Sequence, residues 1–170
     1  MEAVVGKIMV EPSLEQYRQQ AATGDPGAIF DLAWKYFRER KSAEDLQMAI
    51  TTLRQLEEKH PEWARFNIAK MKYIVGDASF KEDIQADCDA GFGPSLYLMG
   101  LFCRKTQGGA NEAISYFRAG AQRGHLPSKI LLWRSSGFRL RVASAFPTYL
   151  AAVRWLAIAL RNPTDVRVLT

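Results

Sequence analysis

The stretch Ala21-Ala22-Thr23-Gly24-Asp25-Pro26-Gly27-Ala28 joins a run of small residues to a glycine and then to a proline. A glycine is typical of the residue that follows a helix, and a proline is typical of the first turn of the next one. The stretch Ala119-Gly120-Ala121-Gln122-Arg123-Gly124-His125 brings small residues and a glycine together in a similar way. Both stretches therefore predict tight joints between helices.

The joint recurs along the chain when Gly24, His60, Gly91 and Gly124 are aligned, with spacings of 36, 31 and 33 residues. Such spacings are typical of repeats made of two helices. Small residues stand four positions after the four anchors: Ala28, Ala64, Ser95 and Ser128. Small residues also stand nine positions after the first three anchors: Ala33, Ala69 and Gly100. A small residue allows a neighbouring helix to approach closely, as stacked helix pairs require.

Helix start signals fall where this repeat needs them. Proline stands at the first turn after three joints, in Asp25-Pro26, His60-Pro61 and Gly93-Pro94. Ser13 with Gln16 and Ser42 with Asp45 form candidate capping boxes. The pattern predicts helices near residues 13–22, 26–40, 43–59, 61–75, 80–90, 94–106, 110–123 and 126–136.

The first joint, continued by Leu32-Ala33 and Tyr36, resembles the opening of a Sel-one-like repeat, and residues 119–125 resemble the end of one. These repeats are relatives of the tetratricopeptide class, and the resemblance covers about residues 13–136. It implies an all-α fold, an α-α superhelix that is a right-handed solenoid of antiparallel helix pairs, and a scaffold or adaptor role. The third unit departs from the pattern, since it is short and Cys103 replaces a tyrosine.

We accordingly expect three regions. Residues 1–12 form an N-terminal segment that is poorly ordered unless docked, because no periodic pattern there is long enough to fold alone. Residues 13–137 form the repeats, and residues 138–170 form a C-terminal apolar and basic helix with a tail.

Stacked helix pairs leave a concave surface lined by the first helix of each pair, which is the natural binding site of a solenoid. By resemblance to tetratricopeptide units, the groove positions are Phe30, Trp34, Phe37, Arg38, Phe66, Lys70, Tyr73, Tyr97, Leu101, Arg104, Lys105, Ile130 and Arg134. Aromatic side chains offer contact area and cations pair with carboxylates, so the expected ligand is an apolar or acidic-apolar peptide. The alternative for each aromatic residue is a place in the core.

The C-terminal region carries a long apolar window, since Arg154 is the one charged residue between Val142 and Leu160. A membrane span is not favoured, because Pro147 and Arg154 interrupt the window. Three alternatives stay open: a helix lying in a membrane interface, a cap on the last repeat, or a helix docked in an aromatic groove. The residues expected to make these contacts are Arg139, Arg141, Tyr149, Leu150, Val153, Arg154, Trp155, Leu160 and Arg161.

The charge is uneven, because residues 1–103 carry 12 basic and 16 acidic side chains whereas residues 104–170 carry 11 and 2. A basic region can bind nucleic acid, anionic lipid or an acidic partner. We expect a protein or peptide partner and, as a further candidate, an anionic membrane surface. Nucleic-acid binding is the alternative function, and a homodimer is left open.

Sequence motifs for catalysis or metal binding are not found in the chain. Cys88 and Cys103 fall on helix-packing positions, and His60 and His125 adjoin joints where turn or capping roles are expected. We therefore expect a protein that is not an enzyme and that uses no cofactor or metal. The stretch from Met1 to Lys7 has an acid where a signal peptide needs basic residues, which predicts a cytoplasmic repeat region, or one peripheral at the inner face of a membrane.

Overall fold

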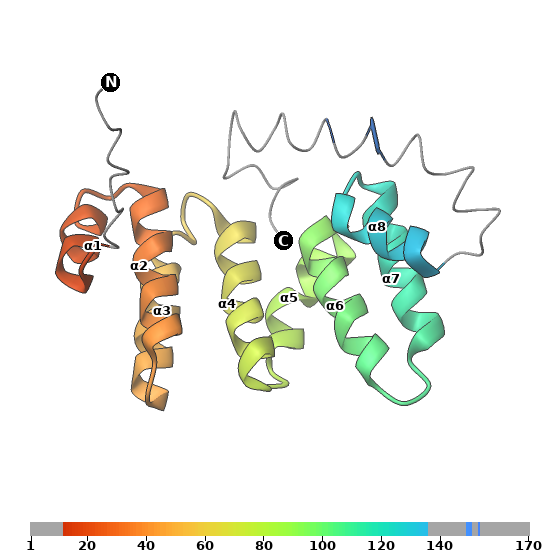
Figure 1. The fold of residues 1–170 in the computed structure, drawn as a ribbon, viewed down its shortest axis with the longest axis horizontal. Coiled ribbons are helices and arrows are strands. Elements are labelled where there is room, and N and C mark those ends of the chain that lie inside the picture. The colour runs from red at the N-terminus through yellow and green to blue at the C-terminus, as the bar shows by residue number, and fades with distance from the viewer. Residues whose placement is uncertain (1–11, 136–148, 151–152, 154–170) are drawn as a thin grey trace, which may run out of the picture. The chain divides into compact units, whose positions relative to one another are not determined.

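The structure is a computed structural model that describes residues 12–135 together with residues 149, 150 and 153. Within residues 12–135 the regular elements are eight helices (Figure 1), which confirms the all-α class for this part of the chain. The helices are α1 Leu14–Ala21, α2 Pro26–Glu39, α3 Ala43–Arg54, α4 Pro61–Val75, α5 Phe80–Asp89, α6 Gly93–Lys105, α7 Ala110–Gln122 and α8 Leu126–Ser135.

Seven of the eight helices begin and end within one residue of the predicted bounds. The exception is α3, which was expected to reach Lys59 and ends at Arg54. Beyond Arg54 the Leu56 amide donates to the Leu53 carbonyl at 2.9 Å, a turn tighter than the α-helix. This turn lets the chain bury Leu56, which is 2% exposed, before the next joint.

The predicted start signals make hydrogen bonds at the helix ends. Ser13 and Gln16 form a reciprocal capping box on α1, and Ser42 and Asp45 form another on α3. The Asp25 carboxylate accepts the Ala28 amide at 2.7 Å and so caps α2. Each cap satisfies amide groups that the first turn of a helix leaves without a partner.

The anchor glycines adopt the left-handed conformation that glycine tolerates best, with φ values of 78° at Gly24, 81° at Gly91 and 90° at Gly124. At the second joint His60 stands in place of a glycine and has a φ of −138°, so the backbone of this joint differs from the other three. The His60 ring packs edge-on against Trp63, with 6.0 Å between ring centroids. The three glycine joints therefore share one backbone geometry that the second joint lacks.

The chain divides into two compact units, Met1–Leu56 and Glu57–Thr170, and each is described by itself. In the first unit, α2 packs against both α1 and α3. Its core consists of Leu56 and of apolar residues from α2 and α3, namely Ile29, Leu32, Ala33, Phe37, Ala49, Ile50 and Leu53. This division falls inside the predicted repeat region, directly after the end of the first complete helix pair.

In the second unit, α4 pairs with α5, α6 pairs with α7, and α8 packs against α7. The first helices of these pairs, α4 and α6, also meet, and α6 contacts α8, which stands where the first helix of a further pair was predicted. Close packing of α6 on α7 requires Gly100, since a Cβ atom there would lie 2.5 Å from the Phe117 ring. The small residue nine positions after the anchor thus has the packing role expected of it.

Candidate partner-binding surface

The groove residues predicted on α2 divide between surface and core. Phe37 is buried at 3% exposure, Phe30 and Trp34 are half-buried, and Arg38 is exposed. Trp34 meets Phe37 edge-on, with 5.3 Å between centroids, and Phe30 at 6.1 Å. Burial raises the pKa of the neighbouring Asp31 carboxyl, and the charge of Arg38 opposes this shift. An aromatic cluster with one exposed cation therefore lies on the first unit.

On α4 the structure places Phe66 in the core and leaves two of its neighbours half-buried. Phe66 is 2% exposed and makes an edge contact with Phe92 at 6.4 Å. Lys70 lies over the Phe66 ring, with its ammonium nitrogen 5.8 Å from the centroid, and burial lowers the pKa of this amine. Tyr73 lies half-buried and contacts Phe80 edge-on.

Helix α6 brings its predicted groove residues to the same surface. The Lys105 ammonium lies over the Tyr73 ring of α4, 4.6 Å from the centroid. Arg104 is exposed and close enough to Tyr97 that its charge opposes the rise in the pKa of Tyr97 that burial causes. Leu101 is half-buried and packs against the core around Cys103. We call Lys70, Tyr73, Tyr97, Leu101, Arg104 and Lys105 the α4–α6 face.

The remaining predicted residues lie on α8, which contacts α6. Ile130 is 38% exposed and Arg134 is exposed. The structure therefore brings together candidate residues from α4 and α6 by direct contact, and it places those of α8 on the adjoining helix. For Phe37 and Phe66 the alternative of a core position holds, because neither ring reaches the surface.

Two ion pairs join α4 to α5 beside this face. The Arg65 guanidinium donates to both carboxylate oxygens of Asp87, with Nε 3.1 Å from Oδ1, and Asp87 is 3% exposed. Lys72 pairs with Asp83, with 2.7 Å between Nζ and Oδ2. Both pairs run from a first helix to a second helix, so they fix the packing of the two helices.

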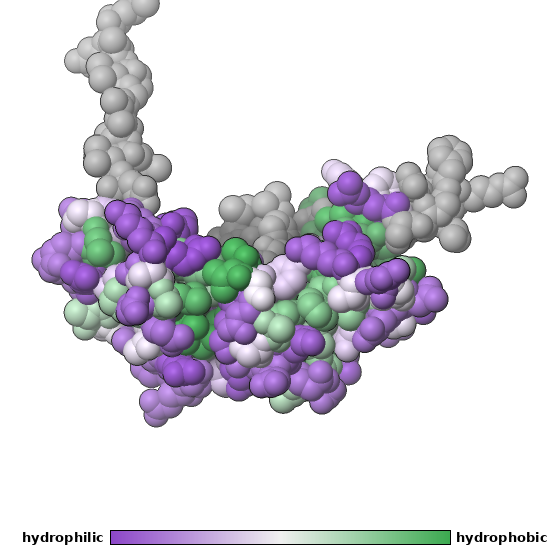
Figure 2. All heavy atoms as spheres, turned by 90° about the horizontal axis from the view of Figure 1, so that it is seen from below, coloured by the Kyte–Doolittle hydropathy of each residue, from purple (hydrophilic) through white to green (hydrophobic). Residues whose placement is uncertain are grey.

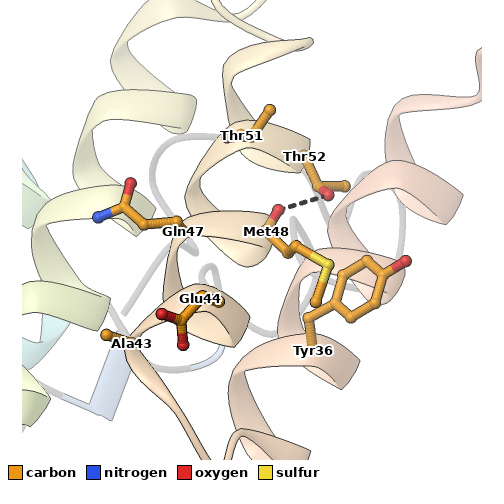
Figure 3. Close-up of a pocket in the computed structure, with 7 residues that line it drawn as sticks. All are labelled: Tyr36, Ala43, Glu44, Gln47, Met48, Thr51 and Thr52. Carbon is orange, nitrogen blue, oxygen red and sulfur yellow. Dashed lines mark hydrogen bonds between the residues drawn. The ribbon is translucent and has the colours of Figure 1, made fainter.

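A hollow of about 420 Å³ on the first unit escaped the sequence analysis. It is lined by Tyr36, Ala43, Glu44, Gln47, Met48, Thr51 and Thr52 (Figure 3). Met48 is 43% exposed, and its thioether lies beside the Tyr36 ring. The signal that could have found this place is Met48, an apolar residue on the polar side of α3.

Comparison of the chain with family models, curated proteins and solved structures finds no match. The resemblance to Sel-one-like repeats consequently stays a prediction from the sequence.

Figure 2 shows a face on which hydrophilic residues predominate and hydrophobic ones form smaller patches.

The two cysteines lie at helix-packing positions, and each histidine lies directly before a helix, although the His60 side chain makes no capping hydrogen bond. Cys88 and Cys103 are buried free thiols, and burial raises the pKa of Cys88 to about 12. His125 is buried directly before α8, and its Nδ1 lies 2.9 Å from Ser128 Oγ. Among the described residues, no group of histidine, cysteine and acidic side chains is arranged to hold a metal ion.

Most of the predicted C-terminal contact residues lie outside the described residues: Arg139, Arg141, Arg154, Trp155, Leu160 and Arg161. The described ones are Tyr149, Leu150 and Val153, which are helical and are 67%, 46% and 49% exposed. Over the described part of the chain, the structure holds no helix with the length and apolar character that a membrane crossing requires.

Proposed function

We propose that this chain is a helical-repeat scaffold that binds a peptide or partner protein through the row of first helices in its second unit. The carrying observation is the contact of Lys105 with Tyr73, which joins the first helices of two successive pairs in one surface. The proposal is supported by the shared backbone geometry of the three glycine joints and by the close helix packing at Gly100, both of which suit a superhelical stack of helix pairs.

The surface has the composition of a recognition site for a peptide. Tyr73, Tyr97 and Leu101 are half-buried, so they present apolar area while their other edges are fixed by the core. Rigid aromatic residues beside exposed cations are typical of energetically important positions in protein interfaces. Because these side chains are held by packing, little conformational entropy is lost when a partner binds.

The test is a selection of short random displayed peptides on the purified full-length chain, followed by mapping of a selected peptide by NMR. We expect chemical-shift changes at Tyr73, Leu101 and Ile130. Shift changes confined to the second helices α5 and α7 would refute this site, and failure to select any peptide would refute the function.

Association with an anionic membrane surface is a second candidate, supported by the exposed apolar side chains of Tyr149, Leu150 and Val153. Their spacing of one and three residues places them on one side of a helix, as an interfacial helix requires. The full-length chain should co-sediment with anionic vesicles, and Leu150→Asp with Val153→Asp should abolish this. Equal sedimentation of the double variant would exclude these side chains as the anchor.

A further inference from the structure

The second unit separates its charges between the two rows of helices. The first helices α4, α6 and α8 carry seven basic residues and one acidic residue, Glu62. The second helices α5 and α7 carry two basic residues and five acidic ones. The net charge of the chain conceals this arrangement, because it sums the two rows.

The cations of the first row have two different environments. Arg65 and Lys72 turn toward α5 and pair with Asp87 and Asp83. Arg104 and Lys105 belong to the α4–α6 face and are exposed. Arg65 and Lys72 are used within the fold. A partner can reach the exposed Arg104, Lys105 and Arg134, and in part the half-buried Lys70 and Lys129.

The cations of the α4–α6 face lie on an apolar floor. Lys105 covers the Tyr73 ring and Lys70 covers the Phe66 ring. Lys70 is half-buried, so its ammonium group has already lost part of its water, and this burial lowers the pKa of the amine. An ion pair formed in such a place is stronger than one in open water, because the surroundings screen the charges less.

We propose that the α4–α6 face binds an acidic peptide, whose carboxylates lie against Lys70, Arg104 and Lys105 and whose apolar side chains pack on Leu101. This inference rests on the proposed function, since it states which class of peptide the scaffold takes. Charge complementarity carries it: Arg104 and Lys105 are exposed and Lys70 is half-buried, so the face attracts acidic segments and repels basic ones.

Nucleic acid is the less favoured anionic ligand, because single-stranded nucleic acids are bound by aromatic rings that stack on bases. Each ring of this face already has a protein side chain packed against it, so Tyr73 and Tyr97 expose only part of the ring area that a stacked base would need. The Lys105 ammonium lies over the Tyr73 ring, and the Tyr97 ring contacts Phe117 and His125 with centroid distances of 6.0 Å and 5.3 Å. A peptide needs no open ring face, since its carboxylates pair with the cations.

The experiment selects short random displayed peptides on the full-length chain and compares their composition with the starting library. We expect enrichment of aspartate and glutamate. A selected peptide should bind Arg104→Glu/Lys105→Glu roughly tenfold or more weakly, because two attractive charges become repulsive. The matched control is Arg118→Glu/Arg123→Glu, which changes the same charge at exposed positions outside the first row and should bind as the unchanged chain does.

Direct contact of a peptide carboxylate with Lys70 can be measured separately. The carboxylate favours the charged form of the amine, so the pKa of Lys70 should rise on binding. NMR titration of the Nζ group would show this rise. Selected peptides without acid enrichment, bound at the same face, would overturn the acidic class and leave the scaffold function standing. Failure to select any peptide would overturn both. Tighter binding of a single-stranded RNA oligonucleotide, lost in the same double variant, would overturn the peptide in favour of nucleic acid.

Discussion

Ser95 and Ser128 stand four residues after Gly91 and Gly124, yet their replacement by alanine should have opposite effects. Both side chains are fully buried. The Ser128 hydroxyl lies 2.9 Å from His125 Nδ1 and forms a hydrogen bond with it. The Ser95 hydroxyl has no hydrogen-bond partner among the described residues. The two substitutions therefore remove the same hydroxyl group, once where it forms a hydrogen bond and once where it forms none.

The magnitudes follow from what each site loses. Ser95→Ala removes a buried hydroxyl that lost its water on folding without gaining a partner, so the free energy of unfolding should rise by about 1 kcal/mol. Ser128→Ala leaves the buried ring nitrogen of His125 without this hydrogen bond, which should cost about 1–3 kcal/mol. For a chain of this length, each kcal/mol corresponds to a change in Tm of about 2–4 °C.

The assay is urea unfolding of the two variants and the unchanged chain, followed by circular dichroism at a helix-sensitive wavelength. The double variant provides the control, because the two effects should nearly add if the serines do not share partners. A loss of stability in Ser95→Ala as large as that in Ser128→Ala would refute the reasoning, since it would show that the Ser95 hydroxyl is satisfied.

Three further substitutions test packing and electrostatics. Gly100→Ala should lower the free energy of unfolding by about 1–3 kcal/mol in urea unfolding, because the clash with Phe117 outweighs the helix propensity gained. Folding raises the pKa of the Cys88 thiol from 9.0 to about 12, so between these pH values the unfolded chain loses this proton and the folded chain keeps it. The thiol should therefore lower the free energy of unfolding of the unchanged chain by about 1.4 kcal/mol per pH unit in this range. Cys88→Ala should remove this contribution. Arg65→Ala should cost about 2–3 kcal/mol in thermal unfolding, because it leaves the buried carboxylate of Asp87 without its charged donor.

Each of these has a control. Adding Phe117→Leu to Gly100→Ala should restore part of the stability, and no restoration would mean that the ring is not the obstacle. An unchanged alkaline slope in Cys88→Ala would show that other groups cause it. Glu15→Gln removes an exposed pair with Arg18 and should cost much less than Arg65→Ala, so equal costs for the two variants would contradict the importance of burial.

The bounds of the helices were predictable because local chemistry determines them. Capping side chains such as Ser13 and Asp25, prolines in first turns and glycines with positive φ act within a few residues along the chain. The end of α3 was predicted wrongly because no local signal marks it. No breaker stands at Arg54, and the helix ends there because Leu56 enters the core, which is an effect of tertiary structure.

The candidate surface was predictable only in outline. Spacing places Phe66 and Tyr73 on related positions of one helix, but it does not encode which of them the neighbouring helix covers, and Phe66 is buried whereas Tyr73 is not. The hollow beside Tyr36 and Met48 was missed because it depends on what lies next to α3 in space. The unsatisfied hydroxyl of Ser95 could not be foreseen either, since alanine and serine look alike as small residues.

The separation of charges between the two rows predicts that stability and the proposed peptide binding depend on different residues. Arg65 lies on the side of α4 that meets α5, where its guanidinium is needed by a buried carboxylate. Arg104 and Lys105 end the neighbouring first helix and are exposed. Arg65→Ala should therefore lower stability, whereas Arg104→Glu/Lys105→Glu should lower peptide affinity and cost less stability than Arg65→Ala, since it removes only an exposed contact of Lys105 with Tyr73. If the charge reversal unfolded the chain as Arg65→Ala does, the exposed cations would be part of the fold and their role as a binding surface would fail.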